Sequence, residues 1–153
     1  MSCIGIVAIG RNEGQRLRRC LESIVNQGAV IVYVDSGSTD GSVEFAKSLG
    51  VTVVELDLSI PFTAARARNA GFQELQTNHP DVEYVQFVDG DCEVISGWID
   101  AAAETLMTQP DVVAVCGWRR ERYPEHSPFN RICDVEWRLG AIGEVGHFGG
   151  DVM

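Results

Sequence analysis

The chain has 153 residues, 45% of which are hydrophobic, and a formal net charge of −10 at pH 7. A chain of this size can bury a core without disulfide bonds, and its acidic balance excludes a protein that holds nucleic acid through many phosphate contacts. The five cysteines include no Cys-x-x-Cys pair, which favours a reduced, cytoplasmic setting over a disulfide framework.

Short apolar runs predict five strands, because each run is rich in β-branched or aromatic residues and is bounded by turn residues. The fourth run is the most aromatic of them and is expected to be the central strand of a sheet. In chain order, the runs are Cys3–Ile9, Val30–Val34, Val51–Leu56, Tyr84–Val88 and Val112–Cys116.

Apolar residues at helical spacing predict helices in the segments that follow these strands. Small residues such as Gly71 share one face of the third helix, which would let it lie close to the sheet. Gly50 is placed to end the second helix, and Ser96 is placed to cap the fourth. The predicted helices cover Leu17–Val25, a segment that ends near Gly50, Pro61–Gln76, a segment that follows Ser96, and Phe129–Leu139.

Strands that alternate with helices predict an α/β fold with a mostly parallel central sheet flanked by helices. We find no internal repeat, low-complexity tract or linker, so residues 1–153 are expected to form a single domain. No signal peptide precedes the first strand, and no apolar stretch is long enough to span a bilayer. The protein is therefore expected in the cytoplasm, free or peripherally at a membrane, and self-association stays open.

Two carboxylates follow the Tyr84–Val88 run at once. Asp89 and Asp91 are separated only by Gly90, whose missing side chain would let the backbone turn so that both carboxylates face one ion. Oxygen ligands of this kind suit Mg²⁺ or Mn²⁺, which share their coordination with substrate phosphates. In a chain this rich in aspartate such a pair also arises by chance, and a solvated turn is the alternative.

Three polar loops are expected to meet at one edge, because the carboxyl ends of parallel strands lie together. Their side chains can bind a nucleoside and hold a metal ion against a diphosphate. Arg66 and Arg68 can reach the phosphates or the base or can be solvated helix charges, and Asp35 and Asp40 can serve only as helix caps. The candidate site residues are Asn12, Glu13, Asp35, Ser36, Ser38, Arg68, Asp89 and Asp91.

The order and spacing of these motifs resemble the nucleotide-sugar-binding half of family 2 glycosyltransferases, which have the GT-A fold. The motifs are Ile9–Glu13 (IGRNE), Asp35–Ser42 (DSGSTDGS), Ala67–Gly71 (ARNAG) and Phe87–Asp91 (FVDGD). The resemblance implies that Asp35 and its loop contact the nucleoside. It also implies a DXD element in which Asp89 lies nearer the ribose and Asp91 binds the metal directly, with Mn²⁺ or Mg²⁺ as the cofactor.

The resemblance also divides the chain into a donor-binding part at residues 1–117 and the start of an acceptor-side part at residues 118–153. Gly149, Gly150 and Asp151 resemble the family's Gly-Gly strand on the acceptor side. The family's catalytic base is expected downstream of Met153, so no catalytic residue is assigned. Ser36 stands where many relatives carry a second acidic residue, which leaves the nucleotide base open.

By resemblance, the protein is expected to transfer a sugar from a nucleoside-diphosphate sugar to a saccharide, a lipid or a small molecule, through an inverting displacement. A non-catalytic nucleotide-sugar-binding module is one alternative. A sugar nucleotidyltransferase is another, but it needs a basic, glycine-rich loop after the first strand, where Ile9–Gly14 offers only Arg11. An NAD-dependent enzyme is disfavoured because no Gly-x-Gly-x-x-Gly follows that strand.

Overall fold

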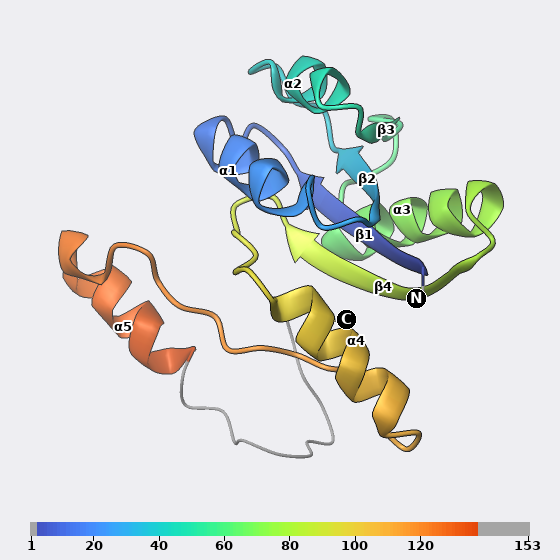
Figure 1. The fold of residues 1–153 in the computed structure, drawn as a ribbon. Coiled ribbons are helices and arrows are strands. Elements are labelled where there is room, and N and C mark those ends of the chain that lie inside the picture. Colours follow the sequence, from blue (N-terminus) through green and yellow to red (C-terminus); the bar gives the residue numbers. More distant parts are fainter. Residues whose placement is uncertain (1–2, 138–153) are drawn as a thin grey trace. The chain divides into compact units, whose positions relative to one another are not determined.

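Residues 3–137, the part of the chain that the computed structural model describes, contain one sheet of four strands (Figure 1). The order across the sheet is β3-β2-β1-β4, and all three pairs of neighbours are parallel. The predicted parallel α/β sheet is therefore confirmed. The strands are β1 (Cys3–Gly10), β2 (Val30–Asp35), β3 (Thr52–Glu55) and β4 (Val82–Asp89).

The helices belong to two compact units, which divide between Val115 and Cys116. The first unit holds the sheet with α1 (Gln15–Ile24), α2 (Ser42–Ser48), α3 (Ala64–Asn78) and α4 (Trp98–Thr108). In the second unit, the described residues form the 3₁₀ helix η1 (Pro124–His126) and α5 (Pro128–Glu136). Between residues 3 and 137, no helix has the length and apolar character that a membrane crossing requires.

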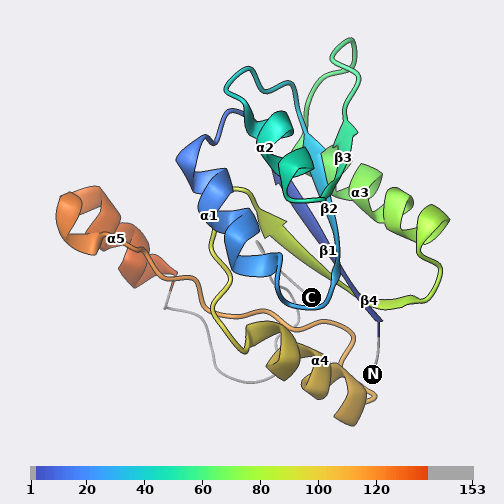
Figure 2. The same cartoon turned by 45° about the horizontal axis from the view of Figure 1, so that its top comes forward.

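The side chains of β1 alternate between two apolar layers, one on each face of the sheet. Ile6 and Ala8 belong to the layer that α1, α2 and α4 complete, whereas Val7 and Ile9 face α3. Figure 2 shows α3 on the side of the sheet opposite α1. All four side chains are buried. This burial on both faces explains why β1 reads as a continuous apolar run.

Helix α3 lies against the sheet as its small residues predict. A Cβ atom added to Gly71 would lie 2.4 Å from Cγ1 of Val7 and 2.9 Å from Cγ2 of Val34. Both neighbours are β-branched side chains of interior strands, so neither can swing aside. Only glycine fits at this point of closest approach.

The strand that was expected to be central, Tyr84–Val88, lies instead in β4 at one edge of the described sheet. Its side chains are mostly half-buried, whereas β1 and β2 lie inside the sheet and are buried on both faces. Aromatic content therefore did not identify the two interior strands, which the structure distinguishes by their burial on both faces.

Two further local expectations are wrong. Val112–Cys116 does not form a strand: Val113 is 93% exposed, and within residues 3–137 the segment joins the sheet at no point, Cys116 alone making an isolated bridge. Ser96 does not cap α4, because Gly97 with φ 83° holds the cap position and Trp98 N–H donates to the Ile95 carbonyl.

Gly50 does end α2 as expected. It has φ 75°, in the left-handed region that favours glycine. Its N–H donates to the Lys47 carbonyl at 3.0 Å. The helix predicted over Phe129–Leu139 ends earlier than expected, because α5 stops at Glu136.

We expect Gly71→Ala to lower the free energy of unfolding by about 1–2 kcal/mol. The 2.4 Å contact puts the overpacking cost toward the upper end of about 1–3 kcal/mol, and a gain of about 1 kcal/mol in helix propensity offsets part of it. Urea denaturation measures the change. Ala65→Gly, at an exposed position of the same helix, gives the propensity contribution alone, and a more stable Gly71→Ala protein would show that α3 is not held so close to the sheet.

Candidate functional site

The parallel pairing brings the ends of β1, β2 and β4 to one edge of the sheet. Gly10, the last residue of β1, pairs with Asp35 at the end of β2, and Ile9 pairs with Asp89 at the end of β4. Seven of the eight candidate residues lie at these strand ends or in the loops that begin there, and the eighth, Arg68, comes from α3. The structure thus places the candidate residues on one edge.

Gly90 ties the Asp89–Asp91 element to the end of β1. Its N–H donates to the Ile9 carbonyl at 2.7 Å, and an added Cβ would lie 2.9 Å from that same oxygen. The backbone turns at Gly90 as expected, with a φ that is not positive, and it is the close approach to the Ile9 carbonyl that requires a glycine. Asp91 projects beyond it as an exposed side chain, with its Oδ1 3.6 Å from the Cys92 thiol, which donates to it.

Arg68 and Arg66 lie in the first turns of α3 but have different partners. Arg68 Nη2 lies 2.6 Å from Asp89 Oδ1, in an ion pair whose side chains are 27% and 34% exposed. Arg66 instead donates to the backbone carbonyls of Ile60 and Asp57, both at 3.0 Å. Arg68 is therefore part of the site, whereas Arg66 holds the loop that connects β3 to α3.

Asp35 is buried, with 3% of its surface exposed, and its carboxylate accepts three hydrogen bonds from the protein. Oδ2 accepts from the N–H groups of Gly37 and Ser38, both at 2.8 Å. Oδ1 accepts from the Tyr33 hydroxyl at 2.8 Å. Asp35 therefore closes its own loop and does not cap α2, whose N-cap residue is Gly41.

The loops after β1 and β2 are joined by hydrogen bonds that involve Asn12. Its N–H donates to Ser38 Oγ at 2.9 Å, and its Oδ1 accepts from the Thr39 N–H at 2.7 Å. Asn12 has φ 55°, which asparagine tolerates better than most residues. Asn12 and Ser38 thus hold each other in place across the site.

Asp40 adds a second link between the same loops. Its Oδ2 accepts from the Gly14 N–H at 2.8 Å, and its Oδ1 accepts from the Ser42 N–H at 3.1 Å. The nearby Ser42 side chain, and after it the N–H groups of Ser42 and Gly14, lower the pKa of Asp40 below its ordinary value. The capping interpretation is thus partly right, because Ser42 is the first residue of α2.

Ser36 lies below this surface. It is 1% exposed, and its N–H donates to the Gly10 carbonyl at 3.1 Å. Ser36 therefore continues the pairing of β2 with β1 by one more hydrogen bond. It contributes backbone structure to the site.

Glu13 is a candidate residue whose surroundings disfavour its ionised form. Burial raises its pKa, the ion pair with Arg16 at 2.6 Å opposes that rise, and the negative charges of Asp91, Asp40 and Asp89 add to it. Four carboxylates therefore share one electrostatic environment. Such an excess of negative charge is what a bound cation would neutralise.

These oxygen ligands fit a hard divalent cation, but not one held by protein alone. In the part of the chain that the structure describes, no three His, Cys, Asp or Glu side chains are grouped closely enough to hold a metal ion. Mg²⁺ and Mn²⁺ often take only one or two carboxylates from the protein and the remaining ligands from water and substrate phosphates. The residues present match that pattern.

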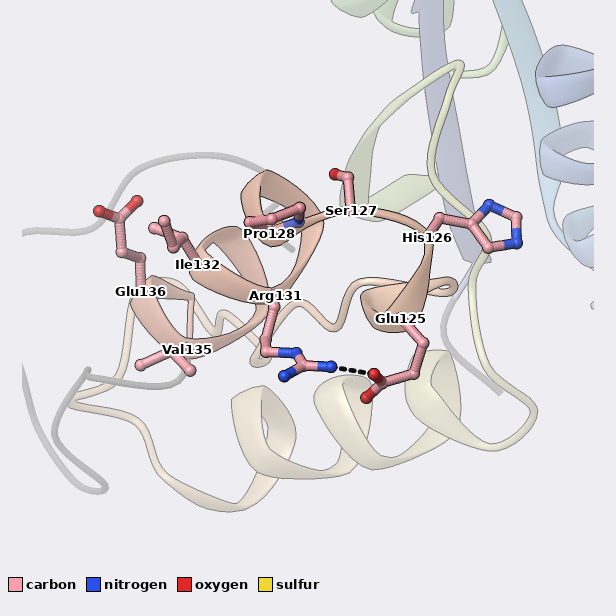
Figure 3. A pocket seen from close by; sticks show the side chains of 8 residues that line it. All are labelled: Glu125, His126, Ser127, Pro128, Arg131, Ile132, Val135 and Glu136. Atoms are coloured by element: carbon pink, nitrogen blue, oxygen red, sulfur yellow. Dashed lines mark hydrogen bonds and ion pairs between the residues drawn. The ribbon is translucent and has the colours of Figure 1, made fainter.

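The second unit has a pocket of about 610 Å³ beside α5 (Figure 3). Arg131 and Glu125, which form an ion pair, belong to its lining together with the apolar residues Ile132 and Val135. Within this unit, buried Asp134 binds Arg120 at 2.8 Å. The pocket contains none of the candidate residues, and Gly149, Gly150 and Asp151 lie outside the described residues.

Tyr33 and Asp40 are two site residues that were not singled out as such from the sequence. Tyr33 lies two residues before Asp35, which puts both side chains on the same face of β2. That spacing is a usable signal for a supporting hydroxyl. The sequence suggests only a helix cap for Asp40. The hydrogen bond that it accepts from the Gly14 N–H, 26 residues away, leaves no pattern in the local sequence.

Comparison with known proteins identifies the chain's relatives. A family model described as "Glycosyl transferase family 2" matches residues 6–142. The chain is 37% identical over 102 residues to the uncharacterized glycosyltransferase YibD of Escherichia coli, covering 63% of this chain and 27% of that protein. It is 25% identical over 103 residues to the glycosyltransferase AglE of Haloferax volcanii, covering 62% and 32% of the two chains.

Among solved structures, glucosyl-3-phosphoglycerate synthase from Mycobacterium tuberculosis is similar in fold. Its complex with Mn²⁺, UDP and glucosyl-3-phosphoglycerate aligns with a TM-score of 0.64 and 19% identity, over 99% of this chain and 56% of that one. The neighbouring fold is therefore GT-A, as predicted. The chain spans about a third of the length of the curated relatives.

We expect Glu13→Gln to stabilise the protein more at pH 7 than at pH 4. The folded-state pKa of Glu13 is raised, so its ionised form costs stability above that pKa, and the cost disappears as pH falls through it. Urea denaturation at both pH values gives the difference between variant and wild type. Glu22→Gln, an exposed position of α1, reports the effect of the amide substitution itself. A larger gain in stability at pH 4 than at pH 7 would contradict a raised folded-state pKa of Glu13.

Proposed function

The chain belongs to glycosyl transferase family 2, and from this membership we propose that it takes part in transferring a sugar from a nucleoside-diphosphate sugar to an acceptor. The acceptor class is a saccharide, a lipid or a small molecule. One observation carries the proposal. Asp35 and Asp89 end the strands on either side of β1, where a cluster of acidic groups gathers, and Arg68 of α3 forms an ion pair with Asp89.

For the nucleoside we propose the surface formed by the loops after β1 and β2, with Asn12, Glu13, Asp35 and Ser38 as binding residues and Ser36 beneath them as their backbone support. The hydrogen bonds that join these loops support this role, because they hold the surface in one shape before a ligand arrives. Preorganisation of this kind lowers the entropy cost of binding. The solved complex of the mycobacterial synthase with UDP favours uracil as the base.

For the diphosphate we propose Asp91 as the direct metal ligand, with Asp89 beside it and nearer the ribose. Asp91 is exposed, whereas Asp89 is held by Arg68. A divalent cation bound there supplies positive charge that stabilises the diphosphate leaving group. The Mn²⁺ in complexes of the mycobacterial synthase supports Mn²⁺ as the cation.

Arg68 has two proposed tasks in the donor site. Its ion pair fixes the orientation of Asp89, and its remaining N–H groups can donate to a phosphate oxygen. We also propose that residues 1–117 form the donor-binding part and that the acceptor side begins at residue 118, which the division of the chain after Val115 supports. An inverting displacement with a carboxylate base is the proposed chemistry, and the base is left unassigned.

Calorimetric titration with UDP and with GDP, each with and without Mn²⁺, tests this proposal. We expect Mn²⁺-dependent binding of UDP in the wild type. In Asp91→Ala the affinity should fall at least as much as the roughly 10–100-fold loss that follows removal of an outer-shell group at a metal site. Asp81→Ala removes an exposed aspartate just before β4 begins, at the opposite end of the same strand, and should bind as the wild type does.

Each arm of the titration addresses a separate part of the proposal. Binding of neither nucleotide under any condition would contradict the donor site as a whole. Equal binding with and without Mn²⁺, retained in Asp91→Ala, would contradict only the metal assignment. A preference for GDP would replace uracil as the base.

A further inference from the structure

We infer that Tyr33 is a positioning residue of the donor site, acting through its hydrogen bond to Asp35. The inference rests on the proposed function, because it assigns a role in nucleoside binding. Tyr33 is fully buried in the middle of β2, so it does not touch a ligand itself. Its hydroxyl donates to Asp35 Oδ1 at 2.8 Å.

The hydroxyl is one of three donors that fix the Asp35 carboxylate. The other two are the N–H groups of Gly37 and Ser38, both on Oδ2. A carboxylate held from both oxygens cannot rotate without breaking a hydrogen bond in a buried environment, which is costly. Tyr33 therefore keeps Oδ2 directed at the loop.

From Asp35 the effect extends to the adjoining loop. The Ser38 N–H is bound by Asp35, and the Ser38 hydroxyl accepts from the Asn12 N–H at 2.9 Å. Asn12 Oδ1 in turn accepts from Thr39. A single buried hydroxyl thus supports the hydrogen bonds that join the two loops of the proposed nucleoside surface.

Tyr33 is suited to this task because it stays a donor. Burial raises the pKa of Tyr33 far above its ordinary value, and the adjacent Asp35 carboxylate raises it further. The Ser38 side chain opposes this rise without cancelling it. The hydroxyl is therefore protonated at neutral pH, where it donates to Asp35 Oδ1.

The first test needs no ligand. In Tyr33→Phe the Gly37 and Ser38 amides should exchange with solvent about tenfold faster than in the wild type, since a hydrogen bond to a charged group is lost from the network. Hydrogen exchange followed by NMR measures this. Tyr84→Phe removes a hydroxyl from the same apolar layer near the start of β4 and should leave both amides unchanged. Unchanged exchange in Tyr33→Phe would overturn the inference.

The second test separates the nucleoside side from the phosphate side. With Mn²⁺ present, Tyr33→Phe should bind UDP about tenfold more weakly, a ratio equivalent to about 1.4 kcal/mol, and should bind inorganic pyrophosphate as the wild type does. In an Asp35→Asn background the same change should have little further effect. Equal losses for both ligands, or UDP binding as tight as before, would overturn the inference. Wild-type protein that binds neither ligand would instead contradict the proposed function.

Discussion

The parallel pairing of β1 with β2 on one side and β4 on the other is the constraint on which the site depends. It sets Gly10 beside Asp35 and Ile9 beside Asp89, so the two carboxylates flank the end of the most buried strand. A slip of one residue in either pairing would exchange the side chains of β1 between the two apolar layers, each of which is packed for its present residues. The apolar core therefore fixes the spacing of the polar groups at the edge.

The polar groups at that edge are held mostly by each other. Asp35, Asn12 and Asp40 each accept hydrogen bonds from backbone N–H groups of the two adjoining loops. The same side chains that would meet a ligand therefore also shape the surface. A substitution at one of them changes contact and shape together, whereas Tyr33 and Gly90, which lie beneath the surface, can change its shape alone.

Sequence patterns predicted most of this fold because the two apolar layers leave strong periodic signals. Four of the five predicted strands correspond to β1, β2, β3 and β4, and Gly50 and Gly71 have the roles that their positions predict. The misplaced features depended on long-range pairing. Tyr84–Val88 looks central by composition, Val112–Cys116 lacks a partner along its length within residues 3–137, and no local rule could choose Gly97 over Ser96. Parallel topology predicted that the site residues would lie together. It did not predict the individual hydrogen bonds between them, such as that from the Gly14 N–H to Asp40.

A solvated turn was the simplest alternative for Asp89-Gly90-Asp91, and its surroundings argue against that interpretation. A solvated turn does not need a glycine whose N–H donates to a neighbouring strand at 2.7 Å and whose added Cβ would meet the same carbonyl. It does not need a half-buried arginine at 2.6 Å from its first carboxylate. The nearby Glu13 also costs stability in its ionised form, because burial and the neighbouring aspartates raise its pKa. A local cost to folding beside two neighbouring carboxylates, one paired with an arginine and one exposed, is typical of a functional site.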